Sequence, residues 1–337
     1  MFDMHYDLLT KLYMCYKEND FTYIEKWIKN YNKNNVKGLI ANLSFMSEDE
    51  MEKEYHINYY DKNISVVEMF EKCMYLLKKY IPDDILVLTS IEGCDYLEIE
   101  DLEKLKELGL NAILPVWNNK NKYGSGNRSD IGLTKDGEKL IKKAIELNIG
   151  IDLSHANEKT FFDIIGIIED YRKNGIFAVV YASHSNTKFI NDVQRNLTDE
   201  QIKALVNVDG KIGIIEHCNF TLNKSMSKKM ALMNTSLYDQ YMDCLKKLYI
   251  CHILHVKDLV GSVNNIVLSS DNMEFSYGNE LYKYSNIFDY SNINNEIKKE
   301  LKEYFNEDEI NKIMYDNAYS IYEKLNNNEF KLRVMQK

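Results

Sequence analysis

"GLTKDGEKLIKKAIELNIGIDLSH" (residues 132–155) is the stretch that best defines the fold, because it holds one complete passage from a helix to a strand. Its first part, "GEKLIKKAIELN", repeats apolar residues with the 3.6-residue period of an amphipathic helix. Its second part, "IGIDLSH" from Ile149, is a short apolar run that ends in polar residues. A continuous apolar strand is typical of a parallel sheet that is covered on both faces.

Eight runs of this kind occur along the chain, and helical patterns separate them. Two capping boxes, "SVVE" (residues 65–68) and "TDEQ" (residues 198–201), mark the starts of such helices. Eight strands that alternate with helices predict an α/β fold, the (β/α)8 TIM barrel. The runs are "FDMHYD" from Phe2, "VKGLIANLSF" from Val36, "ILVLTSIEG" from Ile85, "NAILPVW" from Asn111, "IGIDLSH" from Ile149, "FAVVYASHS" from Phe177, "KIGIIEHC" from Lys211 and "NIVLSSD" from Asn265.

We expect a single barrel domain that spans residues 1–337. Only two prolines and no linker rich in glycine and serine interrupt the chain. From about residue 293 onward the pattern is amphipathic helix without a further strand. We expect these C-terminal helices to pack on the outside of the barrel.

The composition argues against several classes of protein. A net charge of −10, without clustered Lys and Arg, argues against a nucleic-acid partner. The chain has no apolar run of about 18 residues and no signal-peptide pattern, so we expect no membrane association and a cytoplasmic location. The six cysteines include no C-x-x-C pair, which argues against a disulfide framework and a zinc finger.

Polar residues follow several of the predicted strands, at the end of the barrel where TIM-barrel active sites lie. Any one of them could be an ordinary structural residue, but chance placement does not explain the whole set. Imidazole and carboxylate groups bind zinc and similar divalent ions, and one carboxylate can bridge two of them. The set predicts a metal site and consists of His5, Asp7, Glu92, His155, His184 and Asp271.

In this order, the residues and their surroundings resemble the membrane dipeptidase (renal dipeptidase) family, peptidase family M19. The resemblance covers about residues 1–325 and is strongest between residues 132 and 196. It implies a metal-dependent barrel hydrolase that acts on small peptides. The matching segments are "FDMHYDLL", "SIEG", "GLTKDGEKLIKKAIELNIGIDLSH", "YASHSN", "VQRNLTDEQI" and "LSSDNME".

The resemblance also implies two zinc ions per chain, or similar divalent ions. His5 and Asp7 would bind one ion, and Glu92 would bridge both. His155 and His184 would bind the second ion. Asp3, which shares a face with His5, would orient a ligand from behind.

Further site residues are implied for the substrate. Arg195 would hold the substrate near its carboxylate and the reacting carbonyl, and Asp271 would handle protons or the substrate amine. The implied reaction is hydrolysis of a free dipeptide, including one with a C-terminal D-residue, by a metal-bridging hydroxide with Asp271 as general acid and base. The resemblance also makes a homodimer plausible.

Three segments depart from the family pattern. Trp117 stands where members of the family carry a substrate-contacting histidine, so we expect this substrate-binding position to lack one donor. The stretch "SSDNMEF" around Asp271 replaces a glycine-rich segment. Glu216 and His217 follow the seventh strand in place of an apolar stretch, and we predict local hydrogen bonds for them in preference to a third metal.

Two other functions remain open at this point. Trp117 and the altered segment around Asp271 make a related metal-dependent amidohydrolase plausible, one that acts on a lactam, an N-acyl amino acid or an ester. A binding protein without activity is the third hypothesis. The complete set of site residues argues against it.

Overall fold

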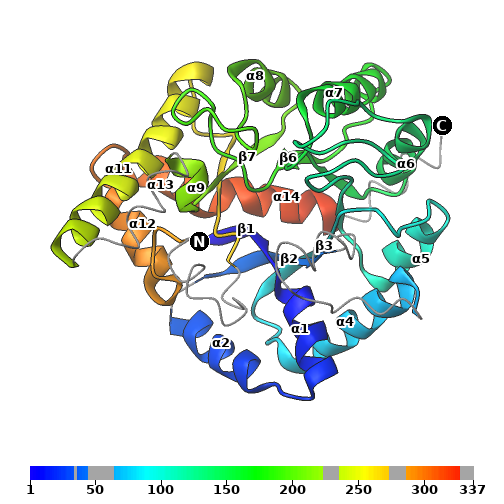
Figure 1. Ribbon diagram of the computed structural model, residues 1–337, viewed down its shortest axis with the longest axis horizontal. Helices are drawn as coiled ribbons and strands as arrows, with labels where there is room; N and C mark the ends of the chain where they lie inside the picture. Colours follow the sequence, from blue (N-terminus) through cyan, green and yellow to red (C-terminus); the bar gives the residue numbers. More distant parts are fainter. Residues whose placement is uncertain (34–35, 45–63, 223–234, 273–285, 327–337) are drawn as a thin grey trace.

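Eight parallel strands form a closed barrel in a computed structural model that describes residues 1–33, 36–44, 64–222, 235–272 and 286–326 (Figure 1). Each strand pairs with the next one in the chain, and Asp3 pairs with Leu268 to close the ring. Every predicted run contains one of these strands, so the predicted TIM barrel is confirmed. The strands are β1 (Phe2–Tyr6), β2 (Gly38–Ser44), β3 (Leu86–Glu92), β4 (Ala112–Leu114), β5 (Gly150–Asp152), β6 (Val180–Ala182), β7 (Lys211–Ile215) and β8 (Ile266–Ser269).

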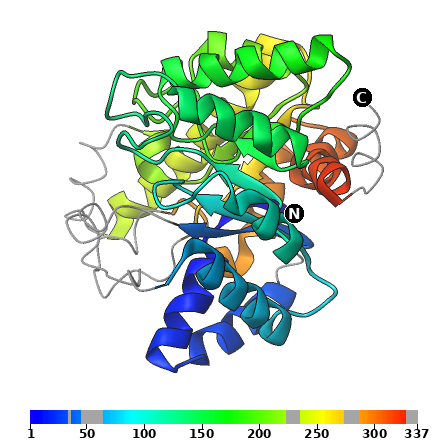
Figure 2. The same ribbon diagram turned by 90° about the vertical axis from the view of Figure 1, so that its right-hand side faces the viewer.

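Helices surround the strands, and in Figure 2 those near the N-terminus and those of the middle of the chain lie on opposite sides of the barrel. Both predicted capping boxes are present, with Ser65 and Thr198 as the N-cap residues. The helices are α1 (Leu8–Glu18), α2 (Thr22–Lys33), α4 (Val66–Tyr80), α5 (Asp101–Leu108), α6 (Lys135–Glu146), α7 (Glu158–Lys173), α8 (Asp199–Asn207), α9 (Cys218–Thr221), α11 (Thr235–Val260), η2 (Tyr290–Asn292), α12 (Ile293–Leu301), α13 (Glu307–Asn311), η3 (Lys312–Asp316) and α14 (Asn317–Asn326).

The strands contribute to two separate apolar clusters. Residues that point outward, such as Leu39, Ile113 and Ile151, pack against the helices. Residues that point inward, such as Met4 and Leu88, fill the barrel. This arrangement explains why the strands are apolar throughout, since side chains on both faces are buried.

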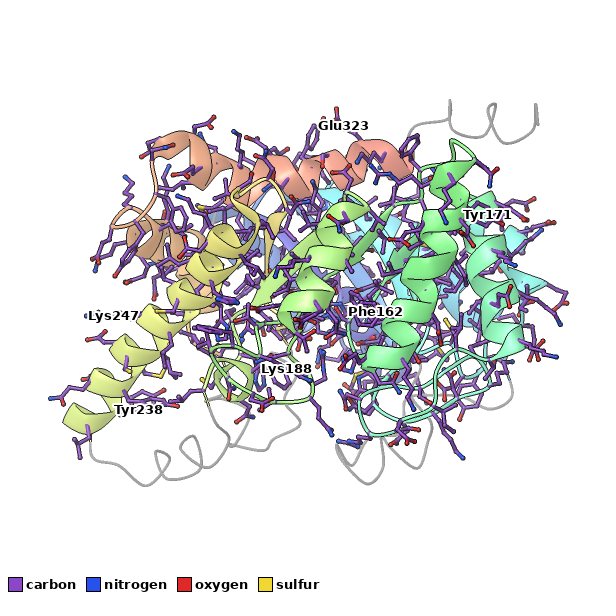
Figure 3. All side chains as sticks on the ribbon, turned by 90° about the horizontal axis from the view of Figure 1, so that it is seen from above. Phe162, Tyr171, Lys188, Tyr238, Lys247 and Glu323 are labelled. Atoms are coloured by element: carbon purple, nitrogen blue, oxygen red, sulfur yellow. The ribbon has the colours of Figure 1, made fainter. Side chains whose placement is uncertain are left out.

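The last helix, α14, covers the amino-terminal end of the barrel. Its side chains Ala318, Ile321 and Leu325 belong to the inner cluster. The Asn317 amide donates hydrogen bonds of 2.7 Å to the carbonyl groups of Val263 and Ile266, at the start of β8. Figure 3 shows α14, marked by Glu323, across this end, while α7 and α11, marked by Tyr171 and Lys247, run along the outside. The carboxyl ends of the strands therefore lie at the opposite end.

No helix within the described ranges is long and apolar enough to cross a membrane.

Candidate metal centre

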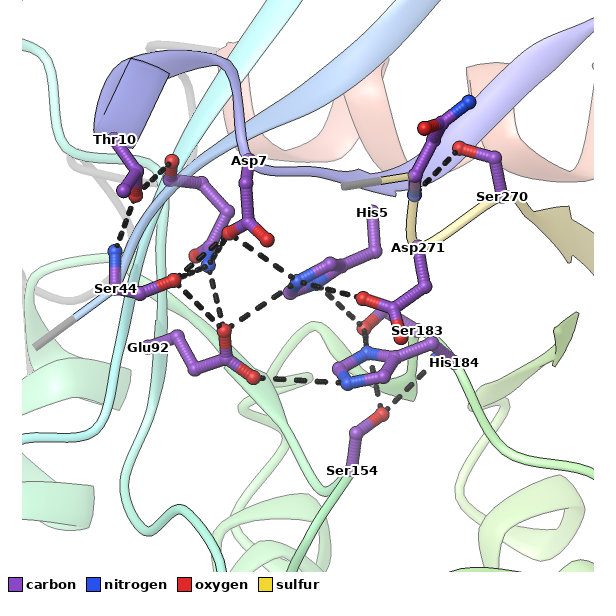
Figure 4. A network of polar contacts seen from close by, with 12 residues as sticks. His5, Asp7, Thr10, Ser44, Glu92, Ser154, Ser183, His184, Ser270 and Asp271 are labelled. Atoms are coloured by element: carbon purple, nitrogen blue, oxygen red, sulfur yellow. Dashed lines mark hydrogen bonds and ion pairs between the residues drawn. The ribbon is translucent and has the colours of Figure 1, made fainter. Parts of the chain in front are cut away.

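The residues predicted as metal ligands meet in one buried cluster at the carboxyl end of the barrel. Figure 4 shows His5, Asp7, Glu92 and His184 of this cluster. They come from β1, β3 and the turns that follow β1, β5 and β6, although up to 179 positions of sequence separate them. Within the described residues, two of the groups that could hold a metal ion share Glu92. The first contains His5, Asp7 and Glu92, and the second contains Glu92, His155 and His184.

Glu92 presents one oxygen to each of these groups. Its Oε1 lies 3.2 Å from Nε2 of His155 and 3.6 Å from Nε2 of His184. Its Oε2 lies 3.5 Å from Nε2 of His5, and Oδ1 of Asp7 lies 4.0 Å from that nitrogen. A carboxylate that divides its oxygens in this way has the geometry of a bridge between two ions.

The nitrogens of the second group favour a cation between them. Nδ1 of His155 lies 2.9 Å from Oδ1 of Asn118, and Nδ1 of His184 lies 2.6 Å from Oγ of Ser183. When both Nδ1 atoms donate their protons to these oxygens, both Nε2 atoms carry lone pairs. These Nε2 atoms are only 3.0 Å apart, so the lone pairs repel one another unless a cation lies between them.

The first group also contains a buried nitrogen that suits a metal. Nε2 of His5 is buried and has no hydrogen-bond partner among the described residues. Burial acts to lower the pKa of His5, but Glu92, Asp271 and Asp7 together raise it to about 10. The excess negative charge that holds a proton on this imidazole would equally attract a divalent ion.

The second group has the opposite electrostatics. Burial and the Arg195 guanidinium lower the pKa of His155 to about 3. Burial also lowers the pKa of His184, and the charge of His5 adds to this effect. Because a histidine must be neutral to bind a metal, both side chains are ready to act as ligands at neutral pH.

Two residues of β2 hold the carboxylates in place and were not predicted from the sequence. The Asn42 amide nitrogen donates to Oδ1 of Asp7 at 3.0 Å and to Oε2 of Glu92 at 2.9 Å. The Ser44 hydroxyl lies 2.8 Å and 3.1 Å from the same two oxygens. The two residues are two positions apart in "ANLS", so their side chains share the inner face of the strand. This spacing is the signal by which the sequence could have indicated them.

Asp152 and Ser183 form a second supporting pair that was not predicted. Oδ1 of Asp152 accepts backbone N–H bonds from Ser154 at 3.0 Å and from Ser183 at 2.9 Å. The Ser183 hydroxyl donates to Oδ2 of the same carboxylate. Asp3 on β1 accepts from the backbone of His5 at 3.3 Å and from the backbone and hydroxyl of Ser270, so its contact with this ligand is to the main chain and not to the ring.

Two site residues have left-handed backbone conformations. The φ angle is 67° at His155 and 45° at Asp271. Such conformations are unfavourable for residues with a side chain and tend to occur at functional sites. Both residues lie two or three positions after the end of a strand, β8 for Asp271 and β5 for His155.

The residues predicted to contact substrate lie around the cluster. Arg195 is half-buried, donates to the backbone carbonyl of His184 at 3.2 Å, and lies over the Phe220 ring. The Trp117 ring is buried, with its centroid 5.6 Å from that of His155. Oδ1 of Asp271 lies 3.8 Å from Nε2 of His5. The structure therefore brings all the predicted site residues to the same end of the barrel.

Glu216 and His217 make local hydrogen bonds. Oε2 of Glu216 accepts from the backbone nitrogens of Ile287 and Phe288, each at 2.9 Å. Nδ1 of His217 accepts from the Asn219 backbone at 3.2 Å and thereby caps α9. Neither residue belongs to a group that could hold a metal in the part of the chain that is described.

A TIM barrel with buried histidines and carboxylates around a shared Glu92 at its carboxyl end has the architecture of the metal-dependent barrel hydrolases. Within this class the chain belongs to the membrane dipeptidase family, peptidase family M19, whose family model matches residues 53–334. This match begins after β1, so it does not include His5 and Asp7.

Individual curated proteins match parts of the chain. The chain is 28% identical over 179 residues to an uncharacterized protein in the PQQ-III 3′ region of Acinetobacter calcoaceticus, with 49% of this chain and 52% of that protein covered. It spans about half the length of the curated relatives that it matches.

Solved structures share the fold over nearly the whole chain. A metallopeptidase of family M19, dipeptidase AC, superposes with a TM-score of 0.72 at 17% identity, covering 96% of this chain and 97% of that one. A metallopeptidase from Rhodobacter sphaeroides, solved with a phosphinate mimic of the dipeptide L-Ala-D-Ala, gives a TM-score of 0.71 at 17% identity over 96% and 98% of the chains.

Proposed function

We propose that this protein is a dinuclear zinc dipeptidase that hydrolyses free dipeptides, including those with a C-terminal D-residue. The observation that carries the proposal is the position of Glu92, whose two oxygens face two separate sets of ligands. Membership of the membrane dipeptidase family supports the same reaction. The D-residue is suggested by the dipeptide mimic in the R. sphaeroides metallopeptidase.

The chain's own residues would hold the ions in the arrangement implied by the family resemblance. His5 and Asp7 would hold one ion, His155 and His184 would hold the other, and Glu92 would lie between them. When bound, two ions at these positions supply Lewis-acid polarisation of the peptide carbonyl and lower the pKa of a water molecule. Asn42 contributes by holding Asp7 and Glu92 at a fixed separation.

Three residues would act on the substrate. The Arg195 guanidinium binds the C-terminal carboxylate of the dipeptide, for which its planar fork of donors is well suited. Asp271 moves a proton between the water and the leaving amine, and its side chain is more accessible (18%) than that of Glu92 (4%). Trp117 forms an apolar wall beside His155, where it contacts the substrate side chain.

The proposal is tested by the metal content and the substrate preference of the purified protein. Protein expressed with added zinc should contain about two ions per chain by elemental analysis. The kcat/KM values for L,L- and L,D-dipeptides should exceed those for N-acyl amino acids and β-lactams. A higher value for the latter compounds would favour the related amidohydrolase, and a metal content near zero would exclude both enzymes.

Metal removal should lower the stability of the folded chain. A ligand that binds only the folded state stabilises it by RT ln(1 + [L]/Kd), or about 2.7 kcal/mol at 100 times Kd. We therefore expect zinc to raise the Tm of chelator-treated protein in a concentration-dependent way in differential scanning calorimetry. Glu92→Gln is the comparison, because its Tm should not respond to zinc. A wild-type Tm that also does not respond to zinc would contradict a site in this cluster.

A further inference from the structure

One hydroxyl group lies behind a proposed ligand of each ion. Oγ of Ser183 is 2.6 Å from Nδ1 of His184 and 3.4 Å from Nδ1 of His5. These two imidazoles belong to opposite sides of Glu92, since Nε2 of His184 faces Oε1 and Nε2 of His5 faces Oε2. Besides Glu92, Ser183 thus contacts both halves of the cluster, as Figure 4 shows.

The direction of the Ser183 proton follows from its third partner, Asp152. This carboxylate is 2% exposed, and its Oδ1 is occupied by two backbone N–H donors. Its Oδ2 faces the Ser183 hydroxyl. Because an ionised carboxylate only accepts hydrogen bonds, the Ser183 hydroxyl donates its proton to Asp152.

The lone pairs of the Ser183 hydroxyl determine which nitrogen of His5 and His184 carries a proton. A serine hydroxyl has one proton and two lone pairs, and the proton is already used. The lone pairs of Ser183 can therefore only accept, from Nδ1–H of His184 and from Nδ1–H of His5. Ser154 is a further neighbour, since its hydroxyl accepts from the His184 backbone and lies 3.4 Å from Oγ of Ser183, the same distance as Nδ1 of His5.

The backbone around Ser183 is held in position by β7. A Cβ atom on Gly213 would lie 1.7 Å from the Ser183 carbonyl oxygen, so only glycine permits the two strands to come this close. The Ser185 amide donates to the Gly213 carbonyl at 2.7 Å on the same strand pair. The hydroxyl therefore has little freedom to move away from Asp152 and the two histidines.

We propose that Ser183, anchored by Asp152, is a positioning residue that accepts from Nδ1–H of both His5 and His184, holds both Nε2 atoms toward the ions and so couples the binding of the two ions. The inference rests on the proposed dinuclear site and deepens it. One hydroxyl serves both metal positions, so its loss weakens both of them together. A residue that supported only His184 would affect one ion.

Zinc titration of Ser183→Ala against a chromophoric chelator tests this coupling. Both dissociation constants should rise by about 10- to 100-fold, the usual effect of removing a partner behind a metal-ligating histidine. Ser185→Ala is the matched control, because this neighbouring serine is also buried but its hydroxyl has no hydrogen-bond partner among the described residues. Weaker binding of one ion alone, or affinities equal to those of Ser185→Ala, would overturn the inference.

A second variant and a spectroscopic measurement guard against a simple folding defect. Asp152→Asn keeps the shape of the side chain, but its amide can donate to Ser183, which then no longer accepts from both histidines. We expect weaker zinc binding here too, with an unchanged circular dichroism spectrum. In ¹⁵N-histidine NMR of the zinc-loaded protein, the Nδ1 protons of His5 and His184 should exchange slowly in the wild type and quickly in Ser183→Ala.

The wild-type titration separates the two possible failures. If the wild type binds two zinc ions and Ser183→Ala binds them equally well, the coupling is wrong and the dinuclear site stands. If the wild type binds no zinc, the proposed function itself is wrong.

Discussion

Glu92→Gln is expected to abolish both metal binding and turnover. The substitution removes the negative charge on which both ligand groups converge, and it replaces one of two ligand oxygens by an amide nitrogen that cannot bind a cation. Zinc affinity should fall by more than the roughly 100-fold that a partner behind a ligand contributes. Elemental analysis and dipeptide hydrolysis, measured on the same preparation, check both expectations.

A matched control for this variant is Glu98→Gln. Glu98 is an exposed acid on the loop after β3 and pairs with Lys122 at 2.7 Å, outside the cluster. The same chemical change there should leave the metal content and the activity unaltered. Two tightly bound ions in Glu92→Gln would show that Glu92 does not bridge them.

The barrel could be predicted from the sequence because its physical cause is local. Each strand is apolar on both faces, and each helix carries its own period and caps, as in "GEKLIKKAIELN" and "TDEQ". These signals do not depend on distant residues. The local signals do not indicate where α14 lies. An amphipathic pattern shows that a helix has an apolar face, but not which surface of the barrel that face will cover.

The proposed ligands could be named because the barrel topology brings all strand ends to one place. His5, Glu92 and His155 are chemically distinctive residues at such ends. Asn42, Ser44, Asp152 and Ser183 were missed because small polar side chains are common in strands and turns. Their role arises only from distances across the barrel, such as that between Ser183 and His5. Part of the segment after Asp271, noted as a departure from the family, lies outside the described residues.

Asp271→Asn should leave the metals bound but make hydrolysis slow. Asp271 belongs to none of the groups that could hold a metal within the described chain. Burial raises the pKa of Asp271 to about 7, with the charge of His5 acting in the opposite direction. A carboxyl group with a pKa near neutrality can both accept and donate a proton, so its loss should lower kcat by about 10²- to 10⁴-fold.

Asparagine is the appropriate replacement because it preserves the backbone. The φ angle of 45° at residue 271 is left-handed, a conformation that asparagine and aspartate tolerate better than other residues with a side chain. An alanine variant would mix a backbone effect with the loss of the carboxylate.

The pH dependence distinguishes proton transfer from a mere change of shape in Asp271→Asn. When the carboxylate acts as a base, the wild-type kcat/KM rises with pH through the pKa of Asp271 as the group loses its proton. The variant cannot titrate at this position, so its residual activity should lack this rise, while elemental analysis still finds about two ions per chain. Loss of zinc from Asp271→Asn would instead make Asp271 a metal ligand, and an unchanged kcat would assign the proton to another group.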